Sequence, residues 1–415
     1  MLGKLPHAEG LEKVERAFQT LSERYLGAEP GFDATYRISL GDVGHTWEVR
    51  CTERAARVCK GATRRRPNVI ISTDSETWLR LREGELSGIE AFRHRLLSAR
   101  GNLDQAIAFE GLFRLPNGRP PLLEISEVPV GKHRISTLTM GHGEPVLLIH
   151  GLGGTRASMF DTASALSEHY KVYAVDLPGF GSSSKPAIGG YNAGWFAAIL
   201  IGLMDELQLS SAHVVGNSMG GRIAIEMGLM APERVSALGL LCPAVAWIKR
   251  GFHPIVRLLR PEFGRLPHAF TRGMVSSQFW GVFHDPDCLD PAVGEVIIDE
   301  FRRIYASAGA RYAFLASARN IYLEKPIGQG GFYPRLAELE PPALFVWGSH
   351  DPLIPPAFGR HVKKWLPSAR QVTLPSCGHL PQVEHPDETN ELLVSFFAEA
   401  ERERERSPRS RLRAA

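Results

Sequence analysis

The chain has 415 residues, of which 44% are hydrophobic and 22% are charged, and its formal net charge is +3. This composition is typical of a globular protein and excludes a disordered or membrane-embedded chain. So small a net charge argues against nucleic-acid binding. The length exceeds one ordinary hydrophobic core, so two domains are expected.

The five cysteines are few and odd in number, and their spacing matches no metal-ligand pattern. We therefore expect free thiols in a reducing compartment and no metal. Charged residues such as Lys4, Glu9 and Lys13 precede any apolar run, which argues against a signal peptide. The sequence predicts a cytoplasmic protein.

The first 116 residues predict a small α+β domain. It is expected to begin with a helix over residues 11–26. Alternating apolar residues, among them Tyr36, Ile38 and Leu40, then predict strands over residues 34–40, 46–51, 68–72 and 96–97.

Helix starts in this domain are marked by capping residues. Capping-box patterns occur at Thr73-x-x-Glu76 and at Ser87-x-x-Glu90. Asn102 is expected to cap a last helix that carries Phe109 and Phe113.

This order of elements resembles the sterol carrier protein type 2 family over residues 8–116. The resemblance is carried by Trp47-Glu48-Val49, by Asn68-Val69-Ile70-Ile71-Ser72 with Asp74-Ser75-Glu76-Thr77-Trp78, and by Gly84-Glu85-Leu86 with Ala91-Phe92. It implies a lipid-binding domain with a tunnel for an acyl chain or a sterol-like ligand. A domain that only packs or dimerises is the alternative.

Prolines and a glycine among charges mark residues 114–121 as a linker, and residues 122–400 then alternate strands with helices. Apolar strands are expected over residues 128–130, 133–140, 145–149, 171–175, 212–215, 237–241, 343–347 and 371–374, the first three as a meander. Helices are expected over residues 193–207, 219–230, 356–366 and 388–400. This rhythm predicts an α/β fold with a parallel sheet covered on both faces and a site at its carboxyl edge.

Two segments fall outside that rhythm. Residues 243–341 contain no clear strand and are expected to form a helical cap over the site. Residues 401–415 form a charged tail in which Glu and Arg alternate, and we expect it to fray from the last helix into disorder.

Gly216-Asn217-Ser218-Met219-Gly220 lies between an expected strand and an expected helix. A serine on so tight a turn is exposed at the helix N-terminus, where it can act as a nucleophile. Asp351 and His379 each follow a later strand, so the three residues should meet at one edge of the sheet. We predict a catalytic triad in which His379 is the base and Asp351 orients it.

A tetrahedral intermediate needs hydrogen-bond donors aimed at its new negative charge. The backbone N–H of Met219 is expected to be one donor and that of Leu152, in the turn after His150-Gly151, the other. His150 is expected to support this turn, although a role as base is its alternative. Asp176 is expected to serve stability.

Residues 128–400 resemble the α/β-hydrolase superfamily. The motifs are His150-Gly151, Asp176-Leu177-Pro178-Gly179-Phe180-Gly181-Ser182-Ser183, the Ser218 turn, Gly348-x-x-Asp351 and Gly378-His379. The resemblance implies the same catalytic roles for Ser218, Asp351 and His379, and no cofactor.

Parts of the sequence resemble meta-cleavage-product hydrolases, which cut carbon–carbon bonds. Those parts are residues 216–221 and Cys377-Gly378-His379 with Glu384-His385-Pro386-Asp387. The turn over residues 151–155 lacks the Gly-Pro-Gly pattern of those enzymes, and Leu380 replaces their tryptophan. The sequence therefore favours an esterase or lipase-like enzyme. Carbon–carbon hydrolysis and a non-catalytic lipid-binding or scaffold protein are the alternatives.

Apolar residues recur at helical spacing in the expected cap, namely Phe252, Ile255, Val256 and Leu259, followed by Phe279, Trp280 and Phe283. A part of this surface that faced Ser218 would suit a hydrophobic or acyl-lipid substrate. Arg64-Arg65-Arg66 is interpreted as a solvated loop, with transient contact to a membrane surface as the alternative. The sequence is compatible with an oligomer.

Overall fold

The computed structural model describes residues 7–248, 260–266 and 271–406, and its contacts divide the chain into two compact units. One unit comprises residues 1–125 and 291–300, and the other comprises residues 126–290 and 301–415. Each has its own sheet and its own hydrophobic core.

The first unit contains a five-stranded sheet in the order β3-β2-β1-β4-β5. Its strands are β1 (Asp33–Leu40), β2 (His45–Thr52), β3 (Ala56–Lys60), β4 (Val69–Thr73) and β5 (Leu97–Gly101). Its helices include α1 (His7–Gln19), α2 (Leu21–Arg24), α3 (Ser75–Glu83), α4 (Gly88–Arg93) and α5 (Leu103–Gly111). β1 and β4 are parallel, and the other neighbouring strands are antiparallel.

The core of this unit is aromatic. The ring of Phe18 stacks on those of Trp47 and Trp78, with centroids 4.3 and 4.5 Å away. The alternating residues of β1 face this core as the sequence predicts, since Tyr36 and Ile38 are completely buried.

Local capping decides where the helices begin. The predicted capping box at Ser87 and Glu90 is confirmed, as is the cap of α5 by Asn102. The predicted cap at Thr73 is wrong, because the carboxylate of Asp74 accepts the Thr77 N–H at 2.7 Å and moves the helix start by one residue. The helix expected over residues 11–26 is divided into α1 and α2.

The second unit contains an eight-stranded sheet in the order β13-β12-β11-β10-β8-β9-β7-β6. The strands are β6 (Leu123–Val130), β7 (His133–Gly141), β8 (Pro145–Ile149), β9 (Lys171–Val175), β10 (Ala212–Asn217), β11 (Val235–Leu241), β12 (Ala343–Gly348) and β13 (Arg370–Leu374). The expected meander is wrong at its end, since β9 lies between β7 and β8. From β9 to β13 all neighbouring strands are parallel.

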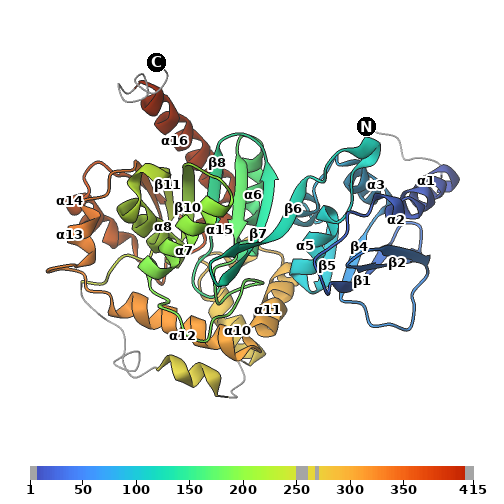
Figure 1. Ribbon diagram of the computed structural model, residues 1–415, viewed down its shortest axis with the longest axis horizontal. Helices are drawn as coiled ribbons and strands as arrows, with labels where there is room; N and C mark the ends of the chain where they lie inside the picture. The colour runs from blue at the N-terminus through green and yellow to red at the C-terminus, as the bar shows by residue number, and fades with distance from the viewer. Residues whose placement is uncertain (1–6, 249–259, 267–270, 407–415) are drawn as a thin grey trace. The chain divides into compact units, whose positions relative to one another are not determined.

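Helices cover both faces of this sheet. They are α6 (Phe160–Ser167), α7 (Ala193–Glu206), α8 (Met219–Met230), α14 (Gly359–Trp365), α15 (Pro381–Glu384) and α16 (Pro386–Arg406). α7 packs against α8, and α6 packs against α16 (Figure 1). Leu238 packs in the core that contains α8, whereas the next residue, Gly239, faces Leu393 and Phe397 of α16. Successive residues therefore point to opposite, covered faces.

The described residues between 243 and 341 form helices and no strand, as the sequence predicts for the cap. These helices are α10 (Arg272–Trp280), α11 (Pro291–Tyr305), α12 (Ala308–Leu323) and α13 (Phe332–Leu336). Phe252, Ile255, Val256 and Leu259 lie outside the described residues.

The expectation for the tail is wrong at its start, because α16 continues through Glu401 to Arg406. Short 3₁₀ helices occur at Pro116–Gly118, Arg156–Met159, Pro232–Arg234, Pro261–Arg265, Pro286–Cys288 and Pro356–Phe358. No helix in the described ranges has the length and apolar character needed to span a bilayer.

Candidate active site

Ser218 stands on a sharp turn between β10 and α8. Its φ of +54° and ψ of −115° are a conformation that residues other than glycine rarely adopt. The turn is held by its backbone, because Ser218 N–H donates to Leu241 O at 2.9 Å and Ala244 N–H donates to Ser218 O at 2.8 Å. The strain therefore persists because the surrounding structure fixes it.

The first turn of α8 is pressed against the end of β8. A Cβ atom on Gly220 would overlap the carbonyl oxygen of Ile149, and one on Gly151 would lie 3.2 Å from Ser218 Cβ. The turn after β8, which contains Leu152, therefore lies beside Ser218. The two predicted oxyanion donors, Leu152 and Met219, each follow a residue at this contact.

His150 holds the same turn in place. Its Nδ1–H donates to the Gly151 carbonyl oxygen at 2.7 Å, and its Nε2 accepts the Leu177 N–H at 3.0 Å. Burial lowers the pKa of His150 below its ordinary value, so the ring is neutral and both nitrogens are occupied. This geometry fits a support for the turn and leaves no nitrogen free to act as a base.

Asp351 and His379 meet at the carboxyl edge of the sheet. His379 Nδ1 lies 2.7 Å from Asp351 Oδ2, and both residues are buried. The other Asp351 oxygen accepts the N–H groups of Leu353 and Ile354, each at 2.8 Å. The carboxylate is thus fixed on both sides and can hold the imidazole in one tautomer.

The Ser218 turn is tied to the His379 loop by Asn217, whose Nδ2 donates to the His379 carbonyl oxygen at 3.2 Å. Within the described ranges, the Ser218 hydroxyl itself has no hydrogen-bond partner. The structure therefore brings Asp351 and His379 into contact and places Ser218 on an adjoining turn.

Cys242 lies beside the carboxylate–imidazole pair. Its Sγ, an Asp351 oxygen and a His379 nitrogen all lie within 4.8 Å of one another, which is the spacing of a candidate metal site. Burial, reinforced by the charge of Asp351, raises the pKa of the Cys242 thiol well above its ordinary value. Because the thiol is protonated and His379 is bonded to Asp351, the donor set suits an acid–base pair better than a metal ion.

Glu384 joins the cap to the loop of His379, and the sequence did not predict this role. One of its carboxylate oxygens accepts the Gly378 N–H at 3.0 Å. The other accepts the N–H groups of His284 and Asp285, at 2.9 and 3.3 Å. The adjoining cap residue Val282 accepts the His379 N–H at 2.9 Å. The sequence carries no local signal for this role, because it depends on contacts with a distant part of the chain.

Aromatic side chains of the cap cover the turn that follows β8. A Cβ atom on Gly153 would lie 3.2 Å from the Phe314 ring and 3.3 Å from the Tyr305 hydroxyl. Elsewhere in the cap, the rings of Phe279 and Phe283 are in contact, with centroids 5.2 Å apart. Two aromatic residues of the cap, Tyr305 and Phe314, therefore lie against the turn beside Ser218.

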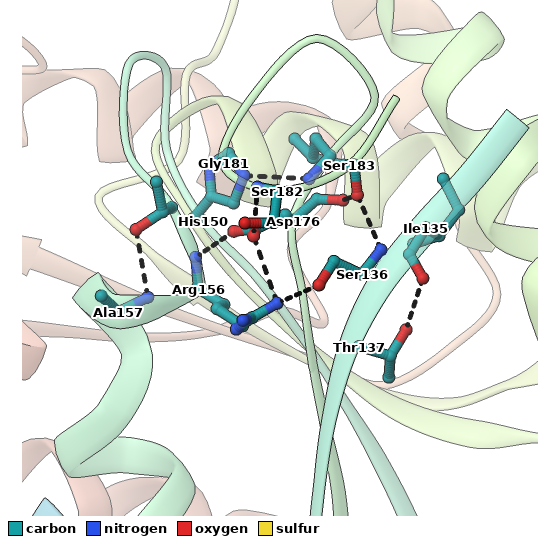
Figure 2. Close-up of polar contacts among 12 residues, drawn as sticks. Ile135, Ser136, Thr137, His150, Arg156, Ala157, Asp176, Gly181, Ser182 and Ser183 are labelled. Carbon is teal, nitrogen blue, oxygen red and sulfur yellow. Dashed lines mark hydrogen bonds and ion pairs between the residues drawn. The ribbon is translucent and has the colours of Figure 1, made fainter. Parts of the chain in front are cut away.

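Asp176 belongs to a separate buried network (Figure 2). One of its oxygens accepts the Arg156 backbone N–H at 2.8 Å, and the other accepts the Ser182 N–H at 2.9 Å and lies 3.2 Å from the Arg156 guanidinium. Arg156 also donates to the Ser136 hydroxyl of β7. This carboxylate therefore joins the loop after β9 to the start of Arg156–Met159.

Comparison with known proteins gives two family matches and several relatives. Residues 146–392 match the alpha/beta hydrolase family, and residues 17–114 match the SCP-2 sterol transfer family. The chain is 29% identical to the uncharacterized hydrolase YugF of Bacillus subtilis (strain 168), over 61% of this chain and 90% of that protein. It is 28% identical to a 2-hydroxy-6-oxo-6-phenylhexa-2,4-dienoate hydrolase of Burkholderia cepacia, over 66% of this chain and 94% of that protein. A solved bacterial membrane phospholipase A matches with a TM-score of 0.58 at 27% identity, over 68% of this chain and 87% of that one.

We expect Asp176→Asn to destabilise the protein, because it removes the buried negative charge that lies 3.2 Å from the Arg156 guanidinium. The loss should be about 3–5 kcal/mol in the free energy of unfolding, measured by urea denaturation. Glu168→Gln, at an exposed acidic position on the same unit, is the control and should change little. Equal stability of the two variants would contradict a structural role for Asp176.

We expect Glu384→Ala to loosen both the cap and the His379 loop. Loss of a carboxylate that accepts three backbone N–H groups should cost roughly 2–3 kcal/mol of unfolding free energy. Glu384→Gln keeps one acceptor oxygen and should be milder. Glu388→Gln changes a neighbouring exposed carboxylate and serves as control. An unchanged urea midpoint in Glu384→Ala would refute this link.

Proposed function

Because the chain belongs to the alpha/beta hydrolase family and carries an SCP-2 sterol transfer domain at its N-terminus, we propose that it is a serine hydrolase acting on a hydrophobic carboxylic ester. The observation that carries this proposal is the buried 2.7 Å contact between His379 and Asp351 beside the strained Ser218 turn. A nucleophile, a base and a group that orients the base are what acyl transfer requires.

In the proposed reaction, Ser218 Oγ attacks the ester carbonyl carbon while His379 Nε2 takes its proton. Asp351 holds the proton on Nδ1 and stabilises the imidazolium that forms. The N–H groups of Leu152 and Met219 bind the oxyanion. His379 then protonates the departing alcohol. A water molecule, activated by the same ring, attacks the acyl carbon, releases the acid and restores Ser218.

The Ser218 hydroxyl would join His379 only when substrate is bound. Catalytic hydrogen bonds are often long or absent in the free enzyme and tighten in the substrate complex. The Asn217 contact to the His379 carbonyl already brings the two loops together. The proposal therefore requires the Ser218 hydroxyl to come within hydrogen-bond distance of His379 Nε2 in the substrate complex.

A hydrophobic substrate is favoured by the apolar cap. Tyr305 and Phe314 lie against the turn that would supply one oxyanion donor. The similarity to a solved phospholipase A supports an acyl substrate, and residues 1–116 would bind the acyl ligand for the hydrolase formed by residues 122–400. Tethering would raise the local concentration of a poorly soluble substrate. The proposal places this activity in the cytoplasm.

Carbon–carbon bond hydrolysis is the second candidate. It is supported by curated relatives named as hydrolases of 2-hydroxy-6-oxo-dienoates, which align over nearly their whole length. It predicts turnover of a vinylogous diketone in place of a p-nitrophenyl ester. Kinetics on both substrate types with one preparation distinguish the two reactions.

We expect Ser218→Ala to remove turnover of p-nitrophenyl esters by a factor on the order of 10³ or more while the protein stays folded. The nucleophile is lost, but the turn keeps its backbone contacts. Labelling by a fluorophosphonate probe should disappear with the activity. A normal rate in this variant would mean that Ser218 is not the nucleophile, and no activity in the unaltered chain would favour the non-catalytic alternative.

We expect Asp351→Asn to lower kcat by roughly 10²- to 10⁴-fold, because an amide favours the wrong tautomer of His379. The side chain keeps its size and one acceptor oxygen, so circular dichroism should be unchanged. Steady-state kinetics on a short, soluble ester give the comparison. Near-normal kcat in Asp351→Asn would sink the assignment of this carboxylate.

A further inference from the structure

The interior of the first unit contains a guanidinium group that makes no ion pair with a described residue, although the charges of Glu110 and Glu83 act on it. Arg82 of α3 is only 3% exposed, and within the described part of the chain its Nε and Nη2 atoms have no hydrogen-bond partner. Arg24 of α2 lies close by, since its Nη1 donates to the Arg82 carbonyl oxygen at 3.5 Å, and its own buried Nε is also unpartnered there. Three buried donor nitrogen atoms thus lack an acceptor among the described residues.

Aromatic rings surround Arg82 and compensate its charge only in part. Its Cζ atom lies 5.6 Å from the Trp78 ring, 5.8 Å from that of Phe109 and 5.5 Å from that of Phe113. Cation–π contacts offset only part of the free energy that is lost when an ion is removed from water. Burial lowers the pKa of Arg82 to about 10, so the group stays charged at neutral pH.

Glu110 of α5 is the buried acid of this interior, and it does not pair with Arg82. One of its oxygens accepts the Gly88 N–H at 2.6 Å, and the other has no hydrogen-bond partner among the described residues. Burial raises the pKa of Glu110 to about 7, and the negative charge of Glu90 acts in the same direction. Glu110 is therefore protonated in part at neutral pH and neutralises Arg82 poorly.

The unpartnered atoms of Arg82 form the edge of a guanidinium that binds carboxylates. Nε and Nη2 donate in parallel and match two carboxylate oxygens. Arg50 uses the same two atoms in this unit to bind Asp33, at 3.0 and 2.8 Å. The corresponding edge of Arg82 faces the interior without such a partner.

We propose that Arg82, assisted by Arg24, binds the carboxylate of an acid whose apolar body packs against the aromatic rings of the first unit. The proposal rests on the proposed function in one respect, because ester hydrolysis releases such an acid. A free inorganic anion would satisfy the donors but would gain nothing from the Trp78, Phe109 and Phe113 rings. The same donors offer no advantage to an alcohol or an uncharged ester.

The groups that face Glu110 give this site a pH dependence. Arg82 attracts its negative charge, Glu90 repels it, and the Gly88 N–H binds it. Arg24 and Glu83 act on Arg82, with opposite signs. As the pH falls through about 7, Glu110 takes up a proton and stops competing for Arg82, while the acid ligand stays ionised. Binding should therefore be stronger at about pH 6 than at about pH 8.

Isothermal titration of the full chain with laurate tests the proposal, with Ser218→Ala present throughout so that turnover plays no part. Laurate should bind, and adding Arg82→Met should weaken its binding roughly tenfold or more. Arg57→Met, the same change at an exposed position of β3, is the matched control and should have no effect. Dodecanol should bind equally with and without Arg82→Met, and inorganic phosphate should bind weakly in both cases.

Glu110→Gln keeps the test decisive if Arg82→Met fails to fold. It should bind laurate with the same affinity at about pH 6 and about pH 8, because the competing charge is gone. The proposal is overturned if Arg82→Met does not weaken laurate binding and Glu110→Gln does not alter its pH dependence. It is also overturned if phosphate binds as tightly as laurate. Ester turnover by the unaltered chain is measured separately, so failure of the hydrolase proposal and failure of this one are distinguishable.

Discussion

The close packing of the first turn of α8 against the end of β8 is the constraint on which the second unit's site depends. Gly220 has no side chain, so the helix can approach the Ile149 carbonyl, and it does so directly after Ser218 with its positive φ of 54°. The same approach places Gly151 against Ser218. A larger residue at position 220 would move the serine and the turn beside it together.

Buried charges then fix the parts of the second unit that the sheet does not fix. Arg222 is on the helix that follows Ser218. Its Nε atom lies 2.9 Å from Glu324 Oε2, and its Nη1 atom lies 2.9 Å from Glu226 Oε2. Glu226 also pairs with Arg335. This network joins α8 to the residue after α12 and to α13. Glu384 joins another part of the cap to the His379 loop through hydrogen bonds from backbone N–H groups. Charged side chains therefore connect both the nucleophile helix and the histidine loop to the cap.

The sequence was sufficient where a local pattern determines structure. Apolar runs marked most strands, and the order of Ser218, Asp351 and His379 after three of them placed these residues at one edge of the sheet. β3 was missed because Arg57 and Lys60 obscure the alternation of a largely exposed strand. The roles of Glu384 and Arg82 depend on contacts between residues distant in the chain, such as Glu384 with His284, and no local pattern encodes them.

The two units differ in whether the chain itself supplies partners for their buried charged side chains. In the second unit, Asp176, Arg222 and Asp351 all have partners supplied by the chain, so these buried charges are compensated before any ligand binds. In the first unit, Arg82 is buried without such a partner among the residues that the structure describes. Burial of an unpaired ion is unfavourable, and an anion that bound only the folded state would stabilise that unit in proportion to the logarithm of its concentration. The acid that the proposed ester hydrolysis releases is an ion of the kind that the proposed Arg82 site would bind.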